Sequence, residues 1–415
     1  MARRCCAESE NRLLSLDEAL ARIRAAIRPI EGSERVGLKQ AHGRILAEDI
    51  DASIDLPPYS NSAMDGYALR RADIAAAPDV RLKVVGTSFA GCPFEGSLGL
   101  GECIRIFTGA AVPEDADAVI MQEDVLREGD EIRLARIVEL HENIRPAGDE
   151  LKSGERLLDR GKRLTPADLG LLASIGRTDV AVRRKLRAAF FSTGDELRPI
   201  GEPLAHGEIH DSNRYTLHAM LDHSCVEAID LGVVRDDRAA IKQALHEAAK
   251  ISDVVVTSGG VSVGEADYVA EAVGEVGQVD FWKLAMKPGK PIVFGRLGEA
   301  CFFGLPGNPV AVIVTFRQIV RPALLQLMGV PVSPPLRLHA VCRSRLHKAA
   351  GRQEFQRGLF TPDGAGSFSV VGCGAQGSHR LRSMSQANCF IVLSAGNAGV
   401  EPGETVEIEP FEELF

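Results

Sequence analysis

Glycine-rich segments follow three predicted β-strands and could bind a phosphate group. They are residues 193–196 (Thr-Gly-Asp-Glu), 258–267 (Ser-Gly-Gly-Val-Ser-Val-Gly-Glu-Ala-Asp) and 304–309 (Gly-Leu-Pro-Gly-Asn-Pro). Glycine lets backbone N–H groups approach an anion closely, and a helix that starts after such a segment adds a favourable dipole. Any one segment could be an ordinary turn, but three at one sheet edge predict a site for a phosphorylated ligand. The candidate binding residues are Gly194, Ser258, Gly259, Gly260, Ser262, Gly264, Pro306, Gly307 and Asn308.

Lysines crowd the segment of residues 283–291 (Lys-Leu-Ala-Met-Lys-Pro-Gly-Lys-Pro). The lysine ammonium group is a compact donor to oxyanions, and proline and glycine would stiffen the loop that carries it. The segment therefore predicts either an oxyanion site or a solvated basic turn in an acidic protein. The residues concerned are Lys283, Lys287, Pro288, Gly289 and Lys290.

Three carboxylates, Glu196, Asp236 and Asp267, lie at or near predicted strand ends of the same region. Carboxylates close to a phosphate usually indicate a divalent metal, because Mg²⁺ takes one or two carboxylates together with phosphate oxygens and water. Asp236 and Asp267 are the predicted metal ligands. The alternative for Asp236, or for Asp237 beside it, is a cap on the following helix.

A fourth segment of interest, residues 56–68, combines small, polar and aromatic residues without periodicity (Leu-Pro-Pro-Tyr-Ser-Asn-Ser-Ala-Met-Asp-Gly-Tyr-Ala). Packing alone rarely demands this composition, so Asp65 is a candidate functional acid. The alternative is an ordered Ω-type loop in which Asp65 forms an Asx-turn.

Strands and helices alternate through residues 187–330, which would position most of these candidates. A parallel sheet covered by helices on both faces is therefore expected, and such sheets bind ligands beyond the carboxyl ends of their strands. The predicted strands are residues 188–192, 226–234, 253–257, 281–285, 291–294 and 301–304, and the predicted helices are residues 212–223, 237–250 and one that opens at 308–309.

The rest of the chain predicts additional domains around this α/β region. A capped amphipathic helix is expected at residues 13–30 and another helix after Thr165, whereas residues 51–150 and 331–415 show short β-like runs. The expected fold is therefore multidomain α/β plus β. Its parts are a small helical linker domain (1–50 and 151–186), an inserted mostly β domain (51–150), a central doubly wound α/β domain (187–330) and a C-terminal β-barrel-like domain (331–415).

Composition favours a soluble cytoplasmic protein of 415 residues, with 45% hydrophobic and 25% charged residues. A formal net charge of −9 makes a broad nucleic-acid-binding surface improbable. Nine scattered cysteines without a C-x-x-C spacing suggest reduced thiols. The most apolar stretch, residues 309–328, contains Arg317, Gln318 and Arg321, which favours a buried helix over a membrane span.

Seven sequence motifs together resemble those of the molybdopterin molybdenumtransferase (MoeA) family, to which the E domain of gephyrin is also similar. The resemblance covers nearly the whole chain. The motifs are residues 61–68 (Asn-Ser-Ala-Met-Asp-Gly-Tyr-Ala), 107–110 (Phe-Thr-Gly-Ala), 192–197 (Ser-Thr-Gly-Asp-Glu-Leu), 211–214 (Asp-Ser-Asn-Arg), 258–268, 283–291 and 304–309.

The resemblance implies a transferase of molybdenum cofactor biosynthesis that inserts molybdate into adenylylated molybdopterin, releases AMP and requires Mg²⁺. It also implies a MogA-like molybdopterin-binding α/β domain and a homodimer whose active site is shared between subunits. A molybdopterin adenylyltransferase and apo-molybdoenzymes are the expected partners. The family's functional residues fall on Asp65, Thr108, Asp149, Glu196, Asp236, Asp267, Lys283 and Lys287.

Two other functions remain open from the sequence. A related α/β domain adenylylates molybdopterin from ATP, although the β domains and residues 61–68 favour the insertion step. A non-catalytic, gephyrin-like scaffold is the second alternative, but a pure scaffold would not need these acids and lysines. Molybdate and tungstate are too similar in size and charge for the sequence to distinguish them.

Overall fold

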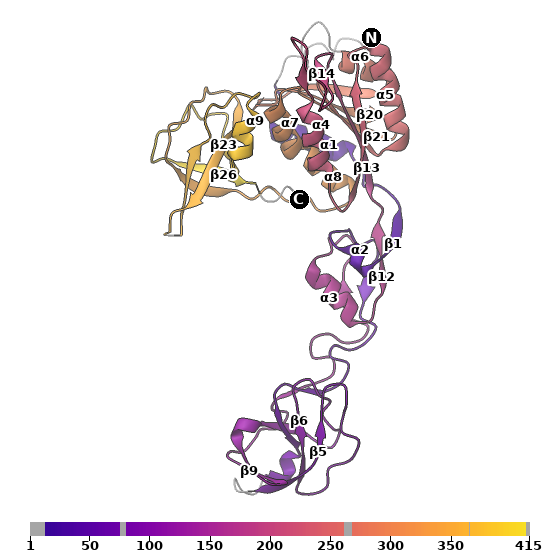
Figure 1. Cartoon of the computed structure of the whole chain (residues 1–415), viewed down its shortest axis with the longest axis vertical. Coiled ribbons are helices and arrows are strands. Elements are labelled where there is room, and N and C mark those ends of the chain that lie inside the picture. Colours follow the sequence, from indigo (N-terminus) through magenta and orange to yellow (C-terminus); the bar gives the residue numbers. More distant parts are fainter. Residues whose placement is uncertain (1–12, 75–79, 261–267, 365, 412–415) are drawn as a thin grey trace, which may run out of the picture. The chain divides into compact units, whose positions relative to one another are not determined.

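The computed structural model describes residues 13–74, 80–260, 268–364 and 366–411, which form two compact units (Figure 1). The first unit contains residues 13–34, 43–45 and 183–411, and the second contains residues 35–42 and 46–182, apart from residues outside the described ranges. The division into four domains stays a prediction.

A six-stranded sheet with the order β16-β13-β17-β21-β20-β18 forms the centre of the first unit. Strands β16, β13, β17 and β21 are parallel, but β20 is antiparallel to both of its neighbours, so the prediction of an all-parallel sheet was wrong. Leu297 of β20 pairs with Ala300 of β21 across a two-residue turn that contains Gly298 at φ +61°. A connection this short can join only antiparallel strands. The strands are β13 (Leu186–Thr193), β16 (Val226–Val234), β17 (Val254–Ser258), β18 (Gln278–Lys283), β20 (Pro291–Leu297) and β21 (Ala300–Leu305).

Helices cover both faces of this sheet, which confirms the doubly wound α/β architecture (Figure 1). Alternate residues of a strand point to opposite faces. Phe190 accordingly packs in a core with α4 (Ser212–Leu221), whereas Phe191 packs in a second core with α5 (Arg238–Ile251) and α6 (Tyr268–Val276). Each buried phenylalanine contributes on the order of 1.5–3 kcal/mol relative to an exposed ring.

A helix of 19 residues, Pro309–Leu327, lies under the first face of the sheet. It consists of α7 (Pro309–Thr315), a π-helical segment η3 (Phe316–Val320) and α8 (Arg321–Leu327). The π-turn precedes Pro322, which lacks the N–H that would continue the α-helical pattern. The helix is long and apolar enough to cross a membrane by length and composition, but 72% of its most apolar window is buried inside the protein. It is therefore typical of a core helix, as the sequence predicted.

The N-terminal helix α1 (Leu16–Ala26) also packs against this core. Ser15 caps it: its hydroxyl accepts from the Glu18 N–H, and the Glu18 carboxylate accepts from the Ser15 N–H. Its buried residues Leu16, Ala19 and Ile23 belong to the α/β part. The domain prediction had instead grouped this helix with residues 151–186, most of which lie in the second unit.

The C-terminal part of the first unit is a closed five-stranded barrel, as the sequence predicted in outline. The strands follow one another as β23-β24-β22-β26-β25, and pairing of β23 with β25 closes the cylinder. The two-residue strand β19 (Met286–Lys287) pairs with β23 and joins the lysine-rich segment to the barrel. The other elements are β22 (Leu338–Cys342), β23 (Gln353–Pro362), β24 (Phe368–Gly372), α9 (Leu381–Gln386), β25 (Cys389–Leu393) and β26 (Thr405–Pro410).

The second unit is built around a six-stranded sheet with the order β7-β4-β6-β5-β9-β8 and an apolar cluster on each face. The main strands are β4 (Gly66–Leu69), β5 (Arg81–Ser88), β6 (Glu102–Ile106), β7 (Ala118–Met121), β8 (Val125–Glu128) and β9 (Glu131–Leu134). The smaller elements are β1 (Ser33–Gly37), α2 (Leu38–Ala41), β2 (Ile50–Asp51), β3 (Asn61–Ser62), β10 (Ile144–Arg145), β11 (Arg156–Leu158), α3 (Pro166–Ser174) and β12 (Asp179–Arg183). The seven described cysteines of the two units are all free thiols.

Candidate functional site

The three glycine-rich segments lie at one edge of the central sheet. Strands β13, β17 and β21 are parallel and in register, since Ser192 pairs with Ser258 and Ser258 pairs with Leu305. The chain therefore leaves all three strands on the same side, at their carboxyl ends. Ligands of open α/β sheets bind at this edge.

Two glycines allow the segments to touch. Gly259 has φ +94°, and a Cβ atom at this position would lie 2.4 Å from the carbonyl oxygen of Thr193. Gly260 has φ +63°, and its Cβ would lie 2.4 Å from Val269 Cγ2. A Cβ on Gly307 would lie 3.8 Å from Gly259 Cα, so the third segment also lies close by. Side chains would force these backbones apart, and their absence leaves a surface suited to phosphate oxygens.

Asn213, at the start of α4, holds two of the segments together. Its Nδ2 donates to Ser258 Oγ and to the Gly307 carbonyl oxygen, both at 2.7 Å. Asp211 positions it, because the Asp211 carboxylate caps the helix by accepting from the Arg214 N–H. Residues 211–214 belong to one of the motifs that carry the family resemblance, but no role was predicted for Asn213. The sequence feature that could have identified Asn213 is its position in the first turn of a helix that Asp211 caps, within the expected ligand-binding domain.

Asp236 lies close to two other acids, Asp195 and Glu196. Burial, followed by the negative charges of those two acids, raises the Asp236 pKa above its ordinary value. The Asp236 N–H donates to Asp195 Oδ1 at 3.3 Å, and Asp236 Oδ1 is buried without a partner. Asp237, by contrast, caps α5 by accepting from the Ala240 N–H. The capping role considered for Asp236 therefore belongs to its neighbour, and the Asp236 carboxylate remains available for a cation.

Several buried polar atoms near this edge and the neighbouring loop are also unsatisfied by protein groups. An unpaired buried polar atom costs about 1–3 kcal/mol, so native structures usually supply water or a ligand. Ser192, Thr193 and Thr257 belong to strand ends, and the other two belong to α4 and to α7 beside Gly289. The atoms are Ser192 Oγ, Thr193 Oγ1, Thr257 Oγ1, Asn213 Oδ1 and Thr315 Oγ1.

The lysine-rich segment begins at the same sheet edge. Lys283 ends β18 and pairs with Pro291, the first residue of β20. Lys287 Nζ forms an ion pair with Glu354 Oε1 at 3.0 Å, and the Glu354 side chain is only 6% exposed. Gln356 Nε2 donates to the other Glu354 oxygen at 3.0 Å. Glu354 therefore fixes the direction of the Lys287 side chain, a contact that the sequence did not predict.

Lys287 also lines an open pocket of about 620 Å³ with Arg345, His347 and Lys348. The Lys348 ammonium donates to the carbonyl oxygens of Ala349, Ala395 and Asn397, and burial lowers its pKa. Lys348 therefore stabilises the barrel loops, whereas Lys287 keeps one exposed side (45% of its side chain) toward the pocket.

Asp65 and Thr108 form a preorganised pair in the second unit. Asp65 Oδ1 accepts the backbone N–H and the hydroxyl of Thr108, each at 2.8 Å. The backbone N–H, followed by the hydroxyl, lowers the Asp65 pKa below its ordinary value. Glycine is required next to Asp65, because a Cβ on Gly66 would overlap the carbonyl oxygen of Ile120 in the adjacent strand β7.

The remaining predicted residues are less constrained. Asp149 is exposed in a loop that bonds to residues 56–57 through the Gly148 and Glu150 N–H groups. Pro306 is buried, Asn308 precedes α7, and Lys290 is exposed. Ser262, Gly264 and Asp267 lie outside the described residues. Within the described ranges, no group of three or more His, Cys, Asp or Glu side chains could hold a metal ion.

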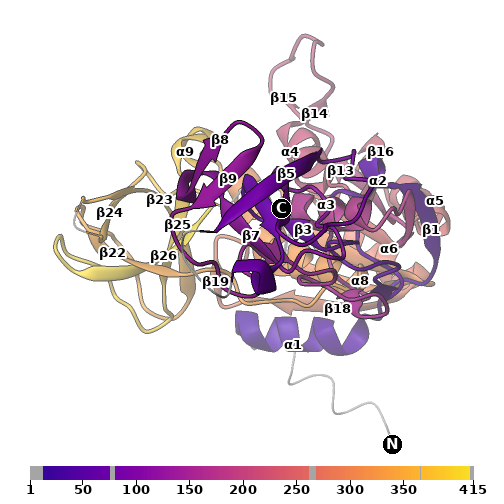
Figure 2. The ribbon, with the colours of Figure 1, turned by 90° about the horizontal axis from the view of Figure 1, so that it is seen from below.

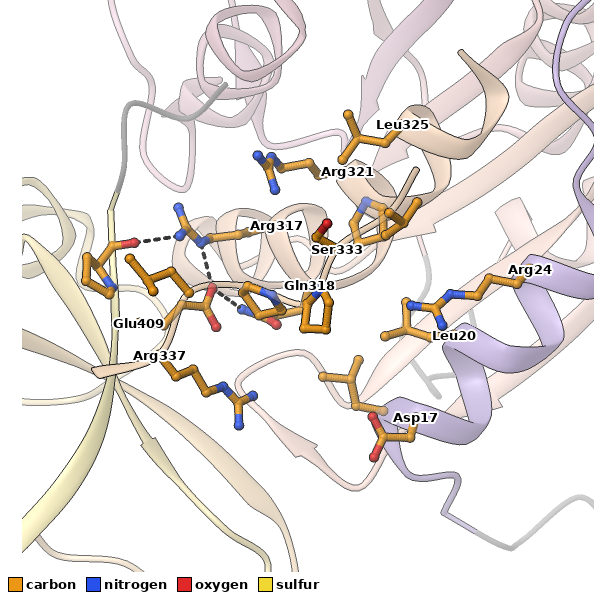
Figure 3. Close-up of a pocket in the computed structure, with 17 residues that line it drawn as sticks. Asp17, Leu20, Arg24, Arg317, Gln318, Arg321, Leu325, Ser333, Arg337 and Glu409 are labelled. Atoms are coloured by element: carbon orange, nitrogen blue, oxygen red, sulfur yellow. Dashed lines mark hydrogen bonds and ion pairs between the residues drawn. The ribbon is translucent and has the colours of Figure 1, made fainter. Parts of the chain in front are cut away.

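A partly open pocket of about 110 Å³ lies elsewhere in the first unit, between α1, the η3–α8 helix, residues 332–337 and β26 (Figure 3). Arg317 Nε and Gln318 Nε2 both donate to Glu409 Oε1, at 2.8 and 2.9 Å. No predicted site residue lines this cavity. Its polar contacts join the long helix to the barrel strand β26.

Known families match the chain in three consecutive parts. Residues 14–176 match the MoeA N-terminal region (domain I and II), residues 189–326 a probable molybdopterin binding domain, and residues 339–411 the MoeA C-terminal region (domain IV).

Individual relatives match over almost the full length. The chain is 44% identical over 405 residues to the molybdopterin molybdenumtransferase of Haemophilus influenzae, covering 97% of this chain and 100% of that protein. It is 36% identical over 389 residues to the Nostoc sp. protein of the same name, covering 91% and 88%. A crystal structure of the molybdopterin biosynthesis moeA protein from Pyrococcus horikoshii superposes with a TM-score of 0.83 at 32% identity, covering 96% of this chain and 100% of that one.

Proposed function

From its membership of the MoeA family, to which the chain belongs, we propose that this protein is a transferase of molybdenum cofactor biosynthesis that inserts molybdate into adenylylated molybdopterin and releases AMP. The full-length relatives with this name support insertion over adenylylation from ATP or a scaffold role. The observation in the structure that carries the proposal is the close approach of the three strand-end segments around Gly259.

The backbone at this edge would bind the phosphates of the adenylylated pterin. Gly260 has no side chain over its N–H group, the Gly259 N–H donates to the Leu305 carbonyl oxygen at 3.1 Å, and Asn213 holds Ser258 and Gly307 beside them. Positioned backbone donors stabilise charge that develops on phosphoryl oxygens without any rearrangement during the reaction. The helix that begins at Pro309 adds a favourable dipole at the third segment.

The acids at this edge fit a magnesium ion. Asp236 has an unpartnered buried oxygen and a raised pKa beside Asp195 and Glu196, and a divalent cation would relieve this repulsion. Mg²⁺ needs only one or two carboxylates when phosphate oxygens complete its shell, so a three-residue protein cluster is not required. Asp236 and Asp267 would hold the ion. When bound, Mg²⁺ supplies positive charge to the adenylyl phosphate oxygens.

The lysines would bind the molybdate substrate. Lys283 lies at the sheet edge, and Glu354 directs Lys287 from the barrel side. A molybdate dianion would pair with these ammonium groups without a general base, because molybdate is already an oxyanion. The ion pair with Glu354 does not use up the Lys287 ammonium group, because 45% of the Lys287 side chain stays exposed. The ammonium could therefore bind molybdate while it remains paired with Glu354.

We further propose a homodimer in the cytoplasm, with Asp65 and Thr108 completing the active site of the partner subunit. The hydrogen bonds from Thr108 favour the ionised form of Asp65 and lower its pKa, which supports a role for its carboxylate. The adenylylated pterin would come from a molybdopterin adenylyltransferase, and the product would pass to an apo-molybdoenzyme.

A direct assay tests the proposed reaction. The purified chain receives adenylylated molybdopterin, molybdate and Mg²⁺, and AMP release and activation of an apo-molybdoenzyme are measured. We expect both to occur with the wild-type chain and both to fall at least 100-fold in Asp236→Asn. Asp237→Asn is the matched control, because asparagine also caps helices and the helix should be retained.

Three results would contradict the proposal. Formation of adenylylated molybdopterin from ATP and molybdopterin by this chain alone would favour the adenylyltransferase. Absence of AMP release by the wild-type chain, with the oligomer intact, would favour the scaffold. Activity that survives chelation of divalent cations would exclude the magnesium site.

A further inference from the structure

An exposed aromatic ring is held rigidly near the Asp65–Thr108 pair. Phe89 stacks on Phe107 with ring centroids 4.9 Å apart and an interplanar angle of 9°. Phe107 directly precedes Thr108 in the chain, and Thr108 donates two hydrogen bonds to the Asp65 carboxylate. Phe89 is nevertheless 51% exposed, so the stack on Phe107 leaves about half of the residue accessible to solvent.

Phe89 is fixed by the backbone around it. Its N–H and carbonyl groups exchange hydrogen bonds with those of Cys92, both at 3.0 Å, and close a tight two-residue turn. Gly91 adopts φ +79° in this turn. The Phe107 N–H donates to the Ser88 carbonyl oxygen at 3.2 Å, which ties the two ring-bearing segments together. An exposed ring on such a turn has little conformational freedom left, so a ligand that binds to it restricts the side chain only slightly further.

A cation extends the stack from its other end. Arg105 Cζ lies 5.0 Å from the centre of the Phe107 ring and 5.0 Å from that of Tyr67. The Arg105 guanidinium bonds to Gln122, which lies in the 3-10 turn (Gln122–Asp124) after β7. Phe89, Phe107, Arg105 and Tyr67 thus form a continuous series of contacts, here called the Phe89 platform. Its positive charge suits a ligand that carries phosphate.

We propose that the Phe89 platform binds a planar nitrogen heterocycle, the adenine or the pterin ring of the substrate, by stacking it on the open face of Phe89. This inference rests on the proposed function, because adenylylated molybdopterin carries both rings. Flat heterocycles stack on phenylalanine irrespective of their hydrogen-bonding pattern. An aliphatic partner would gain from apolar area but not from the flat, rigid presentation of the ring.

The geometry also accounts for the position of the platform next to an acid. Thr108 directly follows Phe107, and its N–H and hydroxyl donate to the Asp65 carboxylate, so the platform and this acid belong to the same part of the second unit. Arg105 supplies a cation close to Asp65, to which it is electrostatically coupled.

Substitution of Phe89 tests the proposal in the full-length protein. Phe89→Ala removes the ring, Phe89→Tyr keeps its flat face, and Leu126→Ala in β8 is the control, since Leu126 is similarly exposed (57%) in the same unit. Two binding probes, AMP and 6-hydroxymethylpterin, are measured separately by equilibrium dialysis. The KM for adenylylated molybdopterin and the kcat are measured in the insertion assay.

We expect Phe89→Ala to weaken one probe and to raise the KM by about 5- to 20-fold, with kcat changed less than about twofold. Phe89→Tyr and Leu126→Ala should stay within about twofold of wild type. Loss of AMP binding identifies adenine as the stacked ring, and loss of pterin binding identifies the pterin. An unchanged KM and unchanged affinity for both probes would overturn the inference, as would a Phe89→Ala variant that only dissociates the oligomer.

The proposed function and this inference fail in different ways. If the wild-type chain lacks insertion activity, the proposed function is contradicted. If Phe89→Ala nevertheless loses AMP or pterin binding, the platform is still supported. A fully active chain whose kinetics ignore Phe89→Ala contradicts the platform alone.

Discussion

Replacement of Gly259 by alanine tests whether the strand-end segments must touch. Two costs are expected. The φ of +94° is unfavourable for an L-residue by about 1–2 kcal/mol. The added Cβ would also lie 2.4 Å from the Thr193 carbonyl oxygen, and overpacking of this kind costs about 1–3 kcal/mol. Their sum predicts a loss of about 2–5 kcal/mol in the free energy of unfolding.

Gly201 provides the matched control for this variant. It has φ +90° but no atom within 4 Å of an added Cβ. It lies in the loop between β14 (Leu197–Arg198) and β15 (Ile209–His210), which projects from the α/β part (Figure 2). Gly201→Ala should therefore cost only about 1–2 kcal/mol from backbone strain.

Urea unfolding and the KM for adenylylated molybdopterin distinguish the two variants. Gly259→Ala should unfold at a lower urea concentration than Gly201→Ala, and only Gly259→Ala should raise the KM, by about tenfold or more. Equal stability of the two variants, together with an unchanged KM for Gly259→Ala, would refute the argument that close backbone approach builds the ligand site.

Three further predictions concern charges at the site. Asp236→Asn should abolish AMP release yet raise the free energy of unfolding near neutral pH by about 0.5–2 kcal/mol, measured by urea unfolding, because it removes a carboxylate whose raised pKa reflects burial and repulsion; a less stable variant at neutral pH would contradict this. Since Thr108 lowers the Asp65 pKa, the Asp65 pair contributes stability that is present above the pKa of the unfolded state and is lost as the pH falls through the folded one. Thr108→Val should therefore move the acidic limb of the pH–activity profile to higher pH, and an unshifted limb would exclude Asp65 as the titrating group. Lys287→Met should reduce the free energy of unfolding by about 1–3 kcal/mol, because it removes the cation that pairs with the buried Glu354 carboxylate and leaves Gln356 as the donor to its other oxygen. The double variant Lys287→Met/Glu354→Gln should regain stability but not molybdate insertion, and full recovery of activity would show that Lys287 serves only Glu354.

Much of the fold could be predicted because its signals are local. Strand β16 was expected at its observed bounds of Val226–Val234, and the caps Ser15 and Thr165 begin helices as expected. Strand direction was harder, because the reversal at β20 depends on a two-residue turn that resembles any other glycine-containing connection. Strand β26 was missed although its buried residues Val406 and Ile408 alternate with Glu407, which is the pattern of a half-buried strand.

The candidate site also has features that the sequence predicts and contacts that it does not predict. Glycine-rich segments after strands can be read from the chain, and the topology then brings their ends to one edge. The contacts of Asn213 with Gly307 and of Lys287 with Glu354 join residues 94 and 67 positions apart. A single sequence does not predict such pairs, because they depend on tertiary packing of two independently formed elements.

A crystal structure of the protein with adenylylated molybdopterin and molybdate would test the central claim most directly. We predict the adenylyl phosphate against the backbone N–H groups of residues 260 and 307, with a cation bound by Asp236 and the oxyanion beside Lys283 and Lys287. A phosphate bound at any other part of the protein, with the carboxyl edge of β13, β17 and β21 left without ligand, would contradict it.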